Sequence, residues 1–289
     1  MRKIIVNEKY NNKKLNNFIL DSFPSLSKGT LFKALRKKDI RINNVKVSTD
    51  ETIHTGDEIT IYIVDELLFG TNTVNIEVVY EDDNIIVVNK PEGISVTEDS
   101  STMNLSKMMK EKYGNNVNPC HRIDRNTKGL VLFSKNDEAL SILLEKFKNK
   151  EIEKHYIAKV YGIPKSSHEI LKAYLFKDSK KSLVYISDVP KKDYLEIITE
   201  YNILSKDTKL NTATLDINLH TGRTHQIRAH MAHIGFPLIG DGKYGSNEIN
   251  KKFGKKTQEL YSYLLKFNFK TDSSILSYLN NKTIKLNIK

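Results

Sequence analysis

Hydrophobic and polar positions along the first sixty residues follow two patterns. Apolar residues recur at helical spacing in two short segments, Leu15, Phe18 and Ile19, then Leu31, Ala34 and Leu35. Ser27 precedes the second segment and has the side chain of a helix N-cap. "IRINNVKV" alternates around an Asn-Asn turn, and "TGDEITIYI" is a turn that leads into a strand. The pattern predicts two short helices followed by a small β element within residues 14–63.

The rest of the chain has longer alternating or continuous apolar segments. Strands are predicted over "NIEVVYEDDNIIVVNK", "GLVLFSK", "KHYIAKVYG" and "ATLDINLHTG". Helices are predicted over "NLSKMMKEKYG", "NDEALSILLEKFKNKE" and "RTHQIRAHMAHIG", the last of which Gly235 can end. This alternation of strands and helices predicts an α+β fold with a mixed, largely antiparallel sheet.

These differences in hydrophobic pattern divide the chain into a small domain at 11–63, a linker at 64–74 and a large domain at 75–289. Leu67, Leu68 and Phe69 give the linker an apolar patch that can dock on a neighbouring surface.

Composition narrows the class of protein. The chain has 289 residues, of which 39% are hydrophobic and 28% charged, as in a soluble globular protein. No run approaches the roughly 20 apolar residues that span a membrane, and "MRKIIVNEKY" lacks the apolar core of a signal peptide. The single cysteine, Cys120, excludes an internal disulfide and cysteine-cluster zinc sites. We expect a cytoplasmic protein that has no membrane partner.

Charge is concentrated near the N-terminus. The formal net charge is +11, and residues 11–46 hold 9 Lys or Arg against 2 acids. Such a face attracts a phosphate backbone, although a solvated lysine-rich surface has the same composition. If RNA binds here, we expect it to contact Lys28, Lys33, Arg36, Lys37 and Arg41.

Candidate chemistry appears in "NPCHRIDRNTKGLVLFSKN", residues 118–136. Asp124 lies between Arg122 and Arg125, directly before an apolar strand, where a charge is costly to desolvate. Asp124 therefore belongs either to an ion-pair cluster at a strand end or to an active site.

Residues 14–63 resemble an S4 RNA-binding domain. The similarity lies in "LS-x3-L-x3-L", the basic turn, "IRINNVKV" and a closing "GD-x-I-x-I". It implies a helix face that sits on structured RNA, in the region where the positive charge is concentrated.

Residues 75–289 resemble the RluA-type pseudouridine synthases, which include RluC- and RluD-like enzymes. "HRIDRNTKGLVLFSK" matches their catalytic signature, and four further blocks follow the family order: "EDDNIIVVNKPEGI", "KHYIAKVYG", "LHTGRTHQIRAHMAHIGFPLIGDGKYG" and "LYSYLLKF". Ile123, Lys128 and Cys120 depart from the usual pattern. The resemblance implies the pseudouridine synthase fold and the isomerisation of uridine in RNA.

That reaction breaks the N1–C1′ bond, turns the uracil and joins C5 to C1′. It is redox-neutral, so we expect no cofactor. It needs one carboxylate beside C1′, which either attacks the sugar or deprotonates it. Water has to be excluded, because it would leave an abasic site.

The resemblance assigns roles to single residues. Asp124 is the expected catalytic carboxylate, and Arg228 its salt-bridge partner, unless Arg228 simply binds phosphate. Tyr156 is expected to stack on the uracil, and Arg122 to fill the gap left by the extruded nucleotide. The remaining expected RNA or substrate contacts are His121, Arg223, Thr224 and Leu265. Core packing is an equal explanation for Leu265. The alternative for Tyr156 is a tyrosine that only forms part of a strand, with its hydroxyl in water.

Other readings of the sequence are weaker. The four histidines between His220 and His233 have spacings that place only His230 and His233 on one helix face, so we expect no metal site. The expected substrate follows from the S4-like and synthase-like parts together: we expect a monomer that modifies large-subunit ribosomal RNA. Transfer RNA is the alternative substrate, and a non-catalytic RNA-binding or ribosome-assembly factor is the alternative function.

Overall fold

A computed structural model describes residues 1–69, 75–97 and 104–287. The chain forms two compact units, one of residues 1–75 and 97–108, the other of residues 76–96 and 109–289. Among the described helices, none is long and apolar enough to cross a membrane.

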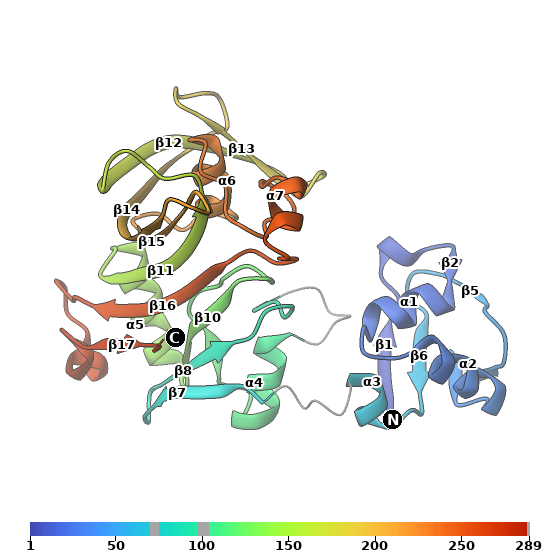
Figure 1. The fold of residues 1–289 in the computed structure, drawn as a ribbon. Coiled ribbons are helices and arrows are strands. Elements are labelled where there is room, and N and C mark those ends of the chain that lie inside the picture. Colours follow the sequence, from blue (N-terminus) through green and yellow to red (C-terminus); the bar gives the residue numbers. More distant parts are fainter. Residues whose placement is uncertain (70–74, 98–103, 288–289) are drawn as a thin grey trace. The chain divides into compact units, whose positions relative to one another are not determined.

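The first unit is a four-stranded antiparallel sheet in the order β1-β6-β3-β4, accompanied by helices (Figure 1). Its elements are β1 (Arg2–Ile5), η1 (Glu8–Tyr10), β2 (Lys13–Lys14), α1 (Leu15–Ser22), α2 (Lys28–Lys37), β3 (Ile40–Ile42), β4 (Val45–Val47), β5 (Thr52–Ile53), β6 (Glu58–Ile61) and α3 (Asp65–Phe69). The Ser27 hydroxyl accepts a hydrogen bond from the Thr30 amide at 3.1 Å, so it caps α2 as predicted. Apolar residues of α1 and α2 and Ile40, Ile59 and Ile61 form one buried core.

The unit extends beyond the predicted limits of 11–63. Strand β1 pairs with β6 along its whole length, so the unit begins at the first residues of the chain. Part of the predicted linker is helical: Leu68 of α3 is fully buried, and the Phe69 ring lies 5.5 Å from that of Phe23. Residues 65–69 thus pack as part of this unit, while 70–74 lie outside the described residues.

The second unit is built on an 11-stranded sheet in the order β13-β12-β14-β15-β11-β16-β10-β8-β7, with β17 beside β16 and β9 beside β10 (Figure 1). The strands are β7 (Glu77–Glu81), β8 (Ile85–Lys90), β9 (Asn118–Pro119), β10 (Lys128–Ser134), β11 (Ile152–Tyr161), β12 (His168–Asp178), β13 (Leu183–Ser187), β14 (Leu195–Asp207), β15 (Thr212–Leu219), β16 (Leu260–Phe267) and β17 (Thr283–Lys285). Among these described strands only β10 and β16 pair in parallel. The predicted α+β fold with a largely antiparallel sheet is confirmed.

Helices flank this sheet. They are α5 (Asp137–Lys148), α6 (Gln226–His233), α7 (Asn247–Lys252) and the 3-10 helix η2 (Ser274–Leu279), whereas α4 (Leu105–Tyr113) spans the boundary between the two units. Asn136 caps α5, whose Ala139 and Leu143 pack with Leu130 and Leu132 of β10 in a buried cluster. Ala229 of α6 belongs to another buried cluster, with residues of β12, β13 and β14. Helix α6 is therefore fixed against one part of the sheet and α5 against another.

Candidate active site

Asp124 lies on the loop between β9 and β10, and hydrogen bonds hold this loop to the segment after β8. Gly93 and Arg125 exchange bonds, from the Gly93 amide to the Arg125 carbonyl at 2.9 Å and from Arg125 Nε to the Gly93 carbonyl at 2.8 Å. Lys90 is fully buried and donates to the carbonyls of Pro91, Ile94 and Arg125 at 2.8, 2.7 and 3.0 Å. Burial lowers the Lys90 pKa to about 8, although the negative charge of Asp124 opposes this shift, and the ammonium therefore stays mostly charged at neutral pH.

A glycine beside this loop allows two strands to approach. Gly129, at the start of β10, has a φ of +115°, and a Cβ there would clash with the Ser262 carbonyl of β16. The parallel pairing of β10 with β16 therefore begins next to Asp124 and brings the residues of β16 to the site.

Asp124 is linked to a buried ion pair through one guanidinium. Arg228 of α6 donates from Nη1 to Asp124 Oδ2 at 3.1 Å, and from Nε and Nη2 to the two carboxylate oxygens of Asp241 at 2.7 and 2.9 Å. The amides of Lys243 and Tyr244 also donate to Asp241, at 2.8 and 3.1 Å. Asp241 therefore fixes the plane of Arg228, and Arg228 presents its remaining nitrogen to Asp124.

This pairing settles which of these groups are charged. Burial alone would raise the pKa of Asp241, but the bonds and charge of Arg228 hold it below its ordinary value. Burial likewise opposes the charge on Arg228, but the two carboxylates raise its pKa. The side chain of Asp241 is 1% exposed, that of Arg228 8% and that of Asp124 21%. Of these three side chains, that of Asp124 is the most exposed in the open cavity, which Arg228 also lines.

Tyr156 faces the same cavity from β11. Its partner on β16 is Ser262, and the β11–β16 register shifts between His155 and Tyr156. Such an irregularity re-aims a side chain beside a functional site. Burial, reinforced by the negative charge of Asp124, raises the pKa of Tyr156, so the phenol keeps its proton.

The cavity has a volume of about 220 Å³. Its lining includes most residues expected at the site, namely His121, Arg122, Asp124, Tyr156, Arg223 and Arg228. It also includes residues that were not among the expected site residues, namely Ile123, Thr127, Lys154, Leu219, Gly222, His225, Gln226, Ile227 and Leu260.

Three residues expected to contact RNA or substrate have surroundings that favour a structural role. Thr224 is half-buried beside the lining residue Arg223 but does not itself line the cavity. Leu265 is fully buried in the core with Leu132 and Phe267, which agrees with the core-packing alternative, whereas Leu260 of the same strand lines the cavity. His121 accepts from the Leu132 amide at 3.1 Å, and burial lowers its pKa to about 3, so it holds β10 as a neutral ring.

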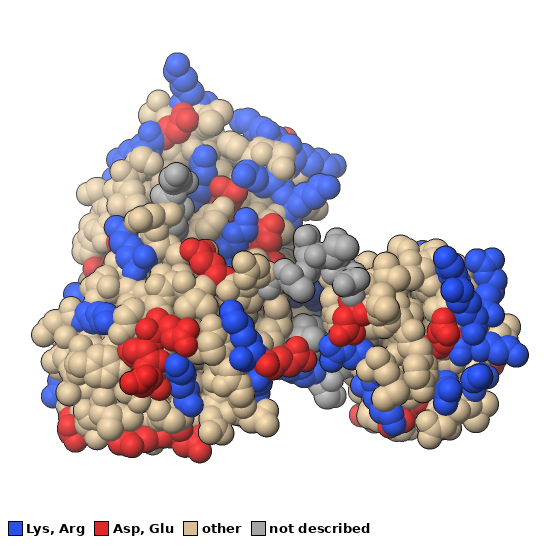
Figure 2. Space-filling model, turned by 90° about the horizontal axis from the view of Figure 1, so that it is seen from below, with Lys and Arg blue, Asp and Glu red and all other residues tan. Residues whose placement is uncertain are grey.

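The basic residues of the first unit lie on its surface. Lys28, Lys33, Arg36 and Lys37 are exposed on α2, whereas Arg41 is half-buried with its guanidinium 4.9 Å from the centre of the Tyr62 ring. Figure 2 shows lysine and arginine gathered over the side of this unit that carries α2. They form a separate basic face on that unit.

His225 is a further member that sequence reasoning missed. It precedes α6 with a φ of +54°, Nδ1 lies 2.8 Å from the Tyr244 hydroxyl, and Nε2 lies 4.0 Å from Asp124. Burial lowers its pKa, so the imidazole is neutral. Asp241 and Tyr244, which contact Arg228 and His225, were missed as well. Both fall within "GDGKYG", so this part of the family motif was the available signal for these two residues.

An arginine-held aspartate beside a buried tyrosine, at the central strands of a largely antiparallel sheet, is the arrangement expected of an RNA pseudouridine synthase. The solved human RNA pseudouridylate synthase domain containing 1 has the same fold, with a TM-score of 0.59 and 22% identity over 68% of this chain and 80% of that one. The sequence profile of the RNA pseudouridylate synthase family matches residues 84–233.

Two relatives that match over most of their length are also pseudouridine synthases. Ribosomal large subunit pseudouridine synthase C of Buchnera aphidicola subsp. Schizaphis graminum is 29% identical over 88% of this chain and 84% of its own length. The protein of the same name from Rickettsia bellii is 33% identical over 82% of this chain and 84% of its own. The chain belongs to the RNA pseudouridylate synthase family, in its RluA-type group, and is a pseudouridine synthase.

Proposed function

We propose that this enzyme converts uridine to pseudouridine in large-subunit ribosomal RNA, as a cytoplasmic monomer that needs no cofactor. The RNA is proposed from the names of the relatives, which are ribosomal large subunit pseudouridine synthases. The observation that carries the proposal is the Asp124 carboxyl group, 3.1 Å from Nη1 of Arg228, in a cavity that it shares with Tyr156.

In this proposal, Asp124 acts on the ribose of a flipped uridine. A carboxylate serves the reaction by bonding to C1′ or by removing a sugar proton, and both routes need the ionised form that a guanidinium favours. Because Asp241 already fixes Arg228, the guanidinium is in place beside Asp124 before the substrate arrives.

The protonated Tyr156 stacks on the uracil, and Leu260 and Ile227 line the same cavity with apolar surface that limits water. Arg122, exposed at the rim, fills the position that the flipped nucleotide leaves in the RNA. The exposed cations of α2 bind RNA phosphates, as in the S4-like unit that the sequence predicts.

The test is tritium release from RNA labelled at uracil C5, with wild-type protein and Asp124→Ala side by side. Ribosomal RNA from cells that lack the protein is the substrate, and transfer RNA from the same cells is the comparison. Release from large-subunit RNA by the wild type alone supports the proposal, because C5 loses its hydrogen when the new bond forms. Release from transfer RNA alone would overturn the proposed substrate.

A further inference from the structure

A groove of about 540 Å³ continues from the cavity that contains Asp124. Both spaces are lined by Lys154, Leu219, Gly222 and Arg223. The groove runs between the end of α5 and the start of β11 on one side and the segment after β15 on the other. Asn268 and Lys270, which follow β16, also line it.

The groove is cationic, and its cations have no acidic partner. It is lined by Lys148, Lys150, Lys154, Arg223 and Lys270. Within the described parts of the chain, no side-chain nitrogen of these five residues makes a hydrogen bond or an ion pair. Neighbouring lysines do: Lys146 lies 3.1 Å from Glu151, and Lys266 lies 3.3 Å from Glu153. The fold has therefore paired the lysines around the groove and left those inside it available to a ligand.

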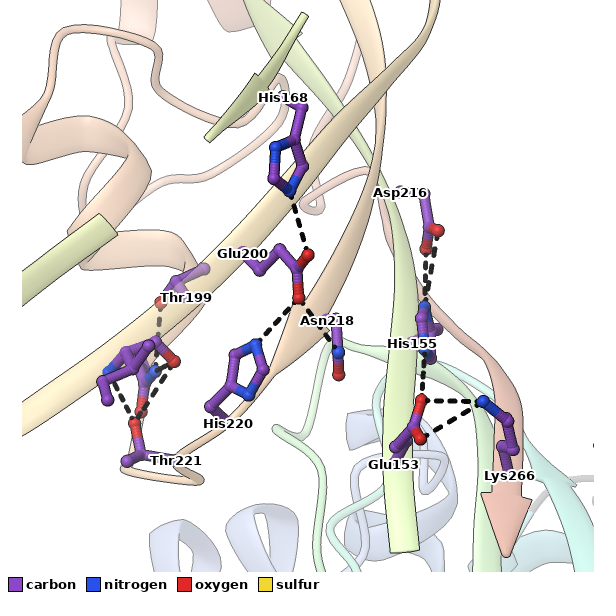
Figure 3. A network of polar contacts seen from close by, with 12 residues as sticks. Glu153, His155, His168, Thr199, Glu200, Asp216, Asn218, His220, Thr221 and Lys266 are labelled. Atoms are coloured by element: carbon purple, nitrogen blue, oxygen red, sulfur yellow. Dashed lines mark hydrogen bonds and ion pairs between the residues drawn. The ribbon is translucent and has the colours of Figure 1, made fainter. Parts of the chain in front are cut away.

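The acids near the groove are already bonded to other side chains (Figure 3). Glu153 lines the groove, and its carboxylate contacts Lys266 and, at 3.5 Å, His155 Nε2. Glu200 lies between two histidines, with His220 Nε2 at 2.8 Å and His168 Nε2 at 3.0 Å. These acids already have side-chain partners, and the five cations that line the groove outnumber Glu153, the one acid in its described lining, so the potential of the groove is positive.

Lys154 lies at the junction of the two spaces. Its ammonium is 5.4 Å from the centre of the Phe147 ring, and burial lowers its pKa. A half-buried ammonium without an anion is costly to maintain, and a bound phosphate would offset that cost. The position of Lys154 is therefore suited to a negatively charged ligand that enters both spaces.

We propose that this groove binds the phosphodiester backbone on one side of the flipped uridine, with Lys154 at the phosphate nearest the cavity. This inference rests on the proposed function, because a nucleotide in the cavity stays attached to its strand. The strand has to leave the cavity, and the groove is a cationic path that opens directly from it. Lys148, Lys150, Arg223 and Lys270 then contact phosphates further along the strand.

The first test removes charge from the groove. The triple variant Lys148→Gln/Lys150→Gln/Lys270→Gln is compared with Lys165→Gln/Lys206→Gln/Lys209→Gln, which removes the same charge. Lys206 and Lys209 lie at or near the turn that joins β14 to β15, and Lys165 follows β11, so the controls are at the other end of β15 from the groove. All six side chains are exposed, so both triples are expected to fold.

Binding is measured by titrating the full-length protein into an RNA fragment that releases tritium with the wild type, at several salt concentrations. The groove triple is expected to raise the Kd about tenfold and to lower the slope of log K against log salt by about 2, since each single-strand phosphate contact contributes about 0.7. The control triple is expected to stay within about twofold of the wild type. Equal effects of both triples, or no effect of either, would overturn the inference.

The second test pairs one lysine with one phosphate. Lys154→Met is tested with RNA that carries a neutral methylphosphonate at either phosphate of the target uridine. One of the two replacements is expected to weaken wild-type binding about tenfold and to leave Lys154→Met unchanged, because the contact is already lost. Additive losses at both phosphates would contradict the assignment of Lys154. If Lys154→Met does not fold, the groove triple replaces it in the same comparison.

Failure of this inference can be distinguished from failure of the proposed function. Without tritium release by the wild type from ribosomal RNA, the proposed substrate fails. With normal release and a groove triple that binds as tightly as the control triple, only the groove assignment fails.

Discussion

Removal of Arg228 should destabilise the protein and reverse the pH dependence that Asp241 gives to its stability. Arg228→Met leaves the buried Asp241 carboxylate with the amides of Lys243 and Tyr244 but no cation. Breaking a buried ion pair from one side costs about 3–5 kcal/mol, because a charge remains without a partner. We expect a loss of this size in the free energy of unfolding at pH 7.

The sign of the pH effect follows from the pKa of Asp241. In the wild type this pKa lies below the ordinary value of 3.8, so the stabilisation is present above that value and is lost as pH falls through the lower pKa of the folded state. In Arg228→Met, only the amides of Lys243 and Tyr244 still oppose burial, so the pKa of Asp241 rises above its value in the wild type. The variant then regains stability as this carboxyl takes up a proton, so its deficit relative to wild type should narrow between pH 7 and pH 4.5.

Urea unfolding followed by far-UV circular dichroism at both pH values measures the deficit. Arg228→Met/Asp241→Asn is the matched control, since it removes the unpaired charge and keeps an oxygen for the two amides. It should recover about 2 kcal/mol of the loss at pH 7 yet form no pseudouridine, because Asp124 still lacks its guanidinium. A deficit below about 1 kcal/mol, or one that is equal at both pH values, would refute the reasoning.

Three further predictions concern other parts of the chain. Asp124→Asn should bind RNA with an affinity near that of wild type and yield no pseudouridine by tritium release; residual turnover would remove Asp124 from its proposed role. Gly129→Ala should lower the midpoint of thermal unfolding by about 4–8 °C, because a strained φ and a clash with the Ser262 carbonyl cost about 2 kcal/mol; an unchanged midpoint would mean that β16 shifts freely. A quadruple substitution to glutamine should lower the salt slope of RNA binding by about 3.6 if α2 lies on duplex RNA, at about 0.9 for each phosphate contact, and an unchanged slope would reassign the basic face. The four positions are Lys28, Lys33, Arg36 and Lys37.

Local patterns in the sequence predicted the positions of helices and strands better than they predicted which strands pair with one another. The cap at Ser27 and the alternation in "KHYIAKVYG" depend on neighbouring residues, and the structure has a helix and a strand there. Strand β1 was missed because four residues, "RKII", say little until β6 supplies a partner more than fifty residues later. The linker boundary failed for a similar reason, since Leu68 is buried by residues from other parts of the first unit.

Strand β16 shows why the motif match left two places open for Leu265, one beneath the base and one in the core. The buried positions of this strand are 260 and 262, then 265 and 267, so the period of two is interrupted where the register with β11 shifts. A sequence pattern does not reveal such an irregularity, and therefore does not tell which leucine reaches the cavity. Motif similarity was the better guide to Asp124, Tyr156 and Arg228, all of which line one cavity.

The use of one arginine by two carboxylates explains how a charged group is maintained in a site that has to exclude water. Asp241 is bonded by Arg228 and by two backbone amides, so the energetic cost of burying an ion pair is met there, away from the substrate. Asp124 takes a single bond from the same guanidinium and keeps its remaining oxygen surface toward the cavity. If both carboxylates were equally well bonded, Asp124 would be fixed but unreactive. If neither were, Arg228 would have to be oriented anew by each substrate, and the site would lose the preorganisation on which electrostatic catalysis depends.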